Sequence, residues 1–156
     1  TQPCLARFGF AAVLFVPTDY VGGSNGFDQD NEPAEPICGW DQLRELSRAG
    51  ISIQSHSVSH RRFSSLTPAE QAAELGDSKS RLEDALDVPV EVFAFPYGDS
   101  GKDPVSCDAA VQEAGYRAAC LYGGGPVKLP TRKPYRLTRL AMGPDSDLAR
   151  LLEANR

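Results

Sequence analysis

The 156-residue chain contains only two histidines, one methionine and one tryptophan, and its four cysteines include no Cys-x-x-Cys pair. That spacing argues against a zinc knot or a redox pair, and four cysteines are too few in this length for a disulfide scaffold. We therefore expect small, buried apolar roles for the cysteines at positions 4, 38, 107 and 120.

Long apolar runs and clusters of basic residues are also missing. No stretch approaches the roughly 18 apolar residues that a membrane span needs, and no signal-peptide pattern is visible. The net charge is −5 with scattered Lys and Arg, which argues against a nucleic-acid partner and favours neutral or cationic substrates. With 41% apolar and 24% charged residues, the composition fits one globular domain, cytoplasmic or extracytoplasmic.

Strand-like and helix-like segments alternate along the chain. A helix is predicted over 67–86, where Thr67 and Glu70 form a capping box and Pro68 takes the first helical position. A terminal helix is expected from about Ser146. The predicted strands are 11–17, 51–56, 90–95, 116–122 and 136–142. This serial order with nearly continuous apolar strands predicts an α/β fold with a parallel sheet covered by helices.

Polar residues follow three of the predicted strands. In parallel α/β folds the functional groups lie at the carboxyl ends of strands, so these residues are expected to share one cleft. They are Asp19, Tyr20, His56, His60 and the Phe-Pro-Tyr-Gly turn at 95–98. The 22–39 loop is about 18 residues long, against a usual 2 to 6, and is either a wall of that cleft or a disordered surface loop.

His56 and His60 are four residues apart, a spacing that lets two imidazoles converge on one metal ion from a tight loop. The spacing alone more often belongs to a surface pair or a hydrogen-bonded pair than to a metal site. A metalloprotease His-Glu-x-x-His motif is excluded, because Ser57 follows the first histidine.

The wider arrangement is more specific than the histidine spacing. GISIQSHSVSH (50–60), a helix with SKSRLE (78–83) and FAFPYGD (93–99) follow one another. Together they resemble the metal-dependent polysaccharide deacetylases of carbohydrate esterase family four, in which His-Ser/Thr-x-x-His supplies two ligands and a Pro-Tyr-Gly turn follows. The agreement extends through GFAAVLFVPTDYVGG (9–23) and AVQEAGYRAACLYGGG (110–125), and so covers most of the chain.

The resemblance implies a distorted, parallel-stranded (β/α) barrel of fewer than eight strands, with residues 1–156 as its catalytic domain. It implies that His56 and His60 bind a divalent metal, usually zinc, and that Ser57 braces the loop between them. Tyr97 would donate its backbone N–H to the oxyanion, in a turn fixed by Pro96. The substrate would be an N-acetylated polysaccharide or oligosaccharide, contacted also by the residues at positions 19, 20 and 97.

The sequence departs from the family at three points. The Thr-Phe-Asp-Asp motif, which supplies a general base and a third metal ligand, is absent, and so is a third histidine for the general acid. Phe95 stands where many members have arginine. Arg139 resembles an arginine of some members that could orient the aspartate, and it equally fits a surface charge at a strand end.

We therefore expect a barrel that lacks its first βα unit in this chain, with the Asp-Asp motif about 20 to 35 residues upstream of Thr1. The chain by itself should bind metal weakly and deacetylate poorly. A free sheet edge at 11–17 should favour homo-oligomers. Two alternatives remain, a degenerate domain that binds carbohydrate without hydrolysing it and a structural histidine pair in an unrelated α/β domain.

Overall fold

The computed structural model of the chain describes residues 2–29, 32–128, 130–143 and 145–153. Its centre is a parallel sheet in the order β1-β2-β3-β4, so each strand lies beside its neighbour in the sequence. The strands are β1 (Val13–Val16), β2 (Ser52–Ser55), β3 (Val92–Ala94) and β4 (Ala118–Cys120). Each lies inside a predicted strand segment, which confirms the α/β fold with a parallel sheet.

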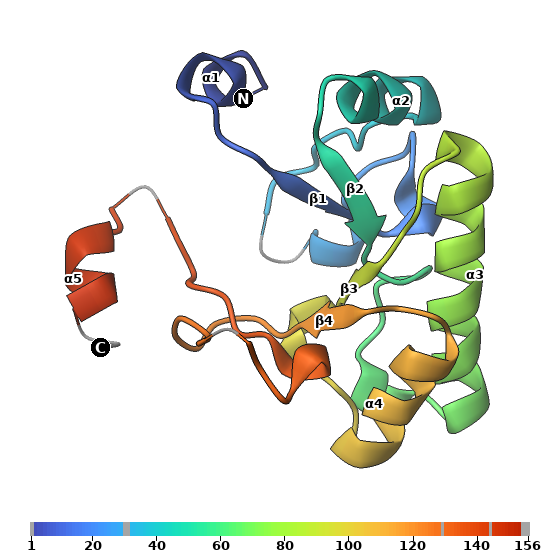
Figure 1. The fold of residues 1–156 in the computed structure, drawn as a ribbon. Coiled ribbons are helices and arrows are strands. Elements are labelled where there is room, and N and C mark those ends of the chain that lie inside the picture. The colour runs from blue at the N-terminus through green and yellow to red at the C-terminus, as the bar shows by residue number, and fades with distance from the viewer. Residues whose placement is uncertain (1, 30–31, 129, 144, 154–156) are drawn as a thin grey trace.

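The helices follow the strands in alternation. In Figure 1, α2, α3 and α4 lie along one side of the sheet, whereas α1 and α5 lie apart from it. No described helix is both long and apolar enough to cross a membrane. The helices are α1 (Gln2–Phe8), α2 (Trp40–Arg48), α3 (Pro68–Leu86), α4 (Pro104–Glu113) and α5 (Leu148–Glu153).

The longest helix, α3, begins with the predicted capping box. The Thr67 hydroxyl accepts from the Glu70 N–H at 3.3 Å, and the Glu70 carboxylate accepts from the Thr67 N–H at 2.7 Å. Leu75 and Leu82 are fully buried on the face that meets the sheet. The capping box therefore fixes the residue at which α3 begins, and the buried leucines fix which of its faces meets the sheet. The same helix also supports the histidine loop.

The centre of the core is a group of three fully buried phenylalanines. The ring of Phe63 is 5.5 Å from that of Phe93 and 5.2 Å from that of Phe95, and the last two are 5.1 Å apart. Edge-to-face and tilted pairs at these separations are favourable. Phe95 therefore packs inside the core and leads directly into the Pro96 turn.

Two expectations about secondary structure and burial need correction. Cys107 and Cys120 are buried, but Cys4 is exposed because α1 lies apart from the sheet, and Cys38 is only partly covered. The predicted strand over 136–142 is reduced to one parallel bridge between Cys120 and Leu137. A short 3-10 turn over Pro134–Arg136 directly precedes that bridge, so little extended chain reaches the sheet.

Candidate functional site

His56 comes directly after β2, and one hydrogen bond holds its backbone while another holds its ring. Its backbone N–H donates to the Val16 carbonyl at 3.0 Å. Its Nδ1 lies 2.7 Å from the Ala94 carbonyl oxygen. Because a carbonyl can only accept, Nδ1 carries the proton, and the lone pair of Nε2 faces the Nε2 of His60 at hydrogen-bond distance. An imidazole held in this way has the tautomer and orientation of a typical metal ligand.

His60 faces His56 from the other end of the loop. The two Nε2 atoms are 3.2 Å apart, and the ring centroids are 4.7 Å apart. Two nitrogen ligands at about 2.0–2.1 Å from one tetrahedral zinc ion lie about 3.3 Å from each other, so this separation suits a shared ion. The buried Nδ1 of His60 has no partner among the described residues.

The described residues contain no cluster of three or more His, Cys, Asp or Glu side chains that could hold a metal ion. Catalytic zinc sites normally use three protein ligands. The histidine pair therefore fits two positions of such a site, and the described part of the chain offers no third ligand of these types.

Both imidazoles are kept neutral by their surroundings. Burial lowers the pKa of His60 from 6.5 to about 4, and the neighbouring His56 acts in the same direction. Burial also lowers the pKa of His56, against the opposing effect of the hydrogen bond to Ala94. Neutral imidazole is the form that binds metal, so at neutral pH the pair would lose no proton on binding.

Tyr97 lies beside the histidines, in the Pro-Tyr-Gly turn that follows β3. Its ring centroid is 4.8 Å from that of His60, and its φ angle of +57° is rare for a side chain of this size. Gly98 follows at φ +69°, where an added Cβ would lie 2.6 Å from the Tyr122 nitrogen. Pro96 begins the turn. Among the described residues the Tyr97 N–H donates to no backbone carbonyl.

Phe27, in the 22–39 loop, belongs to the same cluster, although the sequence did not single it out. Its ring centroid is 4.1 Å from that of His60 at an interplanar angle of 32°, so it covers one face of the imidazole. Its carbonyl accepts from the Tyr97 hydroxyl at 3.0 Å. The ring of Tyr20 meets Phe27 edge-on at 4.8 Å. This loop therefore forms a wall over His60.

The side chains of Arg139 and Asp19 form hydrogen bonds with groups other than the two histidines. The Arg139 Nε donates to the Leu121 carbonyl at 2.8 Å, and its guanidinium lies 5.4 Å from the Phe15 ring centroid. Its positive charge contributes to the lowered pKa of His56. The Asp19 carboxylate accepts from Arg81 at 2.6 Å at the surface. Asp19 is therefore held by α3, and its backbone N–H is bound by the Val58 carbonyl at 3.0 Å.

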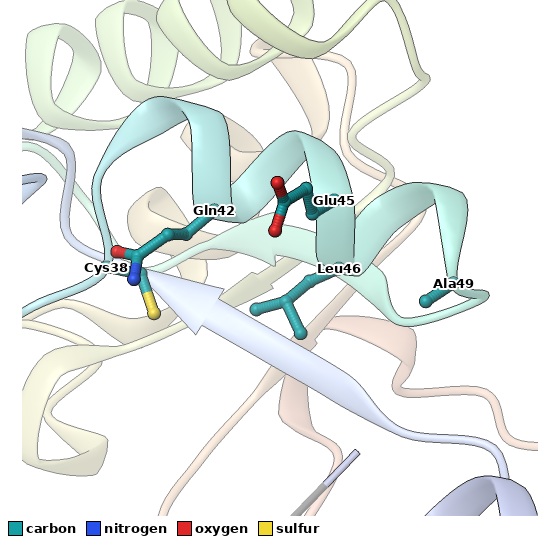
Figure 2. Close-up of a pocket in the computed structure, with 5 residues that line it drawn as sticks. All are labelled: Cys38, Gln42, Glu45, Leu46 and Ala49. Carbon is teal, nitrogen blue, oxygen red and sulfur yellow. The ribbon is translucent and has the colours of Figure 1, made fainter. Parts of the chain in front are cut away.

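Figure 2 shows a hollow elsewhere on the molecule, lined by residues of α2 and of the chain directly next to it. Its volume is about 430 Å³. It offers one carboxylate, one amide and one thiol beside two apolar side chains, and none of the predicted site residues lines it. The lining residues are Cys38, Gln42, Glu45, Leu46 and Ala49.

A family model described as "Polysaccharide deacetylase" matches residues 1–119. The chain is 24% identical over 115 residues to a putative polysaccharide deacetylase, YxkH, of Bacillus subtilis (strain 168). The match covers 74% of this chain and 36% of that protein, so the chain spans about a third of the relative's length.

Two solved structures show the fold. The Streptococcus pyogenes deacetylase PplD in complex with acetate matches with a TM-score of 0.78 at 21% identity, over 99% of this chain and 63% of that chain. BA3943, described as a CE4 family pseudoenzyme from Bacillus anthracis, matches with a TM-score of 0.56 at 17% identity, over 76% of this chain and 36% of that chain.

Proposed function

Since the chain belongs to the polysaccharide deacetylase family, we propose that it contributes to a hydrolase site that removes N-acetyl groups from a polysaccharide or oligosaccharide. The observation that carries this proposal is the convergence of two neutral imidazoles, with their Nε2 atoms 3.2 Å apart. The bond from the His56 Nδ1 to a carbonyl supports this proposal, because it leaves the His56 Nε2 facing the His60 Nε2, as in two ligands that share one ion.

In this proposal His56 and His60 are two ligands of one divalent metal ion, zinc being the usual one in the family. When bound, the ion would polarise the acetyl carbonyl and lower the pKa of a water molecule toward about 7. Ser57 holds the loop, because its hydroxyl accepts the His60 N–H at 3.0 Å.

The Tyr97 N–H is proposed to donate to the oxyanion that develops on the acetyl carbonyl. Removal of one such donor typically costs about 2.7–4 kcal/mol of transition-state stabilisation. The +57° φ angle of Tyr97 and the preceding Pro96 support this role, since they define the direction of the N–H. Arg139, whose charge acts on His56, is proposed to orient an acidic group of the site.

The sugar is proposed to lie along the aromatic side chains next to His60. Tyr20, Phe27 and Tyr97 present rings that suit the apolar faces of a sugar, and Tyr97 is 41% exposed. Asp19 remains a candidate for binding a sugar hydroxyl or amide, although Arg81 now holds its carboxylate.

The chain alone is expected to bind metal weakly and to deacetylate poorly. No cluster of three or more metal-ligating acidic, cysteine or histidine side chains is found in the described part of the chain. The same observation favours a second candidate, a degenerate domain that binds N-acetylated carbohydrate without hydrolysing it.

The test measures two quantities on the 156-residue chain, acetate release from chitooligosaccharides with added Zn²⁺ and amide NMR shifts on addition of the same sugar. We expect slow or no release, and shifts centred on Tyr97 and His60. A His56→Ala, His60→Ala double variant should abolish any release, and Phe8→Ala, far from the histidines, should not change it. Robust release that survives a chelator would contradict metal-dependent deacetylation. No sugar-induced shift at the site would contradict both candidate functions.

A further inference from the structure

Glu74 of α3 is a carboxylate buried to 9% exposure beneath the histidine loop. None of the ion pairs formed by the described residues includes it. A buried carboxylate without a cationic partner is costly unless hydrogen-bond donors surround it. Movement of the groups that donate hydrogen bonds to this carboxylate would therefore cost free energy.

The donors all come from the loop between the two histidines. One Glu74 oxygen accepts the Val58 N–H at 2.8 Å and the Ser59 N–H at 2.9 Å. The other oxygen accepts the Ser59 hydroxyl. Both carboxylate oxygens of Glu74 thus accept hydrogen bonds from the two consecutive residues that lie directly before His60.

This loop has an unusual backbone that needs such support. Ser57 has a φ angle of +72° and His60 one of +57°, a region that non-glycine residues rarely adopt. The Ser57 hydroxyl accepts the His60 N–H. Three successive N–H groups, from Val58 to His60, are therefore bound by side-chain oxygens, two of them by Glu74.

We propose that Glu74 is a positioning residue of the histidine site. Its carboxylate holds the Val58–Ser59 backbone in the conformation that turns His60 toward His56, and so sets the 3.2 Å separation of their Nε2 atoms. The consequence for metal binding rests on the proposed function, whereas the consequence for the loop does not.

The role depends on hydrogen-bond acceptance, which glutamine can largely reproduce. In Glu74→Gln the amide oxygen can accept the two N–H groups, and the amide NH₂ can donate to the Ser59 hydroxyl oxygen. Glu74→Ala removes every acceptor. Glu83→Ala is the matched control, because Glu83 lies on the same helix and binds Lys79 and the Val90 N–H instead of the loop.

The first measurement is hydrogen exchange of the Val58 and Ser59 amides by NMR in the metal-free chain, together with the imidazole signals of His56 and His60. We expect at least tenfold faster exchange at both amides and shifted imidazole signals in Glu74→Ala. Exchange should stay within about threefold of the parent chain in Glu74→Gln and Glu83→Ala.

The second measurement is Zn²⁺ affinity by competition with a chromophoric chelator. Loss of a residue that orients ligands typically costs 10–100-fold in metal affinity, so Glu74→Ala should lose at least tenfold and Glu74→Gln much less. A parent chain that binds no Zn²⁺ would overturn the proposed metal site, while the exchange data would still test Glu74. Unchanged amide exchange in Glu74→Ala would overturn the positioning role. An equal increase in amide exchange in Glu74→Gln and Glu74→Ala would also overturn it.

Discussion

Replacement of Phe27 by alanine should raise the pKa of His60. The Phe27 ring lies 4.1 Å from the imidazole and covers one of its faces, and burial is the largest cause that lowers this pKa from 6.5 to about 4. Opening one face to water stabilises the imidazolium. We expect a rise of about one pH unit, which corresponds to about 1.4 kcal/mol in the free energy of protonation.

The assay is a pH titration of the imidazole Cε1–H signals by NMR. The chain has only two histidines, so a His56→Gln variant assigns both signals. Phe8→Ala is the control, since Phe8 is 63% exposed and stacks on Phe10 instead of a histidine. An unchanged pKa of His60 in Phe27→Ala would refute the shielding role of the loop.

Three further outcomes are expected. The free energy of unfolding should fall as the pH drops from 6.5 toward 4. Both histidine pKa values are lowered in the folded chain, so over this range the histidines of the unfolded chain bind more protons than those of the folded chain. Denaturant titrations at several pH values measure this fall. Gly98→Ala should lower the free energy of unfolding by more than about 1 kcal/mol, since φ is +69° and the added Cβ would meet Tyr122. Gly76→Ala, at an open helical position, should raise it by about 0.5–1 kcal/mol. Urea unfolding that gives the two variants the same stability would contradict this expectation. Val13 is an exposed residue of β1, a strand that pairs only with β2 in the described structure, so Val13→Lys should reduce any self-association seen by analytical ultracentrifugation.

The parts of the fold that the sequence predicted are those with local signals. The Thr67 capping box located the start of α3, and the nearly continuous apolar segments located the strands of the sheet. Parallel pairing of consecutive strands then brought the residues after β2 and β3 to one edge, which is why His60 and Tyr97 were expected to be neighbours.

The parts that were missed depend on contacts between distant residues. Phe27 lies in a loop without periodicity, so nothing local indicates that it stacks on His60. Glu74 has the sequence context of an ordinary helical surface residue, and only the fold shows that its carboxylate is buried beneath the loop. The ion pair of Asp19 with Arg81 joins residues 62 positions apart, which no local pattern encodes.

The most direct test of the central proposal is a Zn²⁺ titration of the chain at pH 7, followed through the imidazole nitrogen signals of His56 and His60. We expect both Nε2 signals to shift together with a stoichiometry of one ion per chain, while the His56 Nδ1 stays protonated through its bond to Ala94. Weak but saturable binding agrees with a site that has only two of its protein ligands in the described residues. Shifts at neither Nε2, or at only one of them, would contradict the shared metal site.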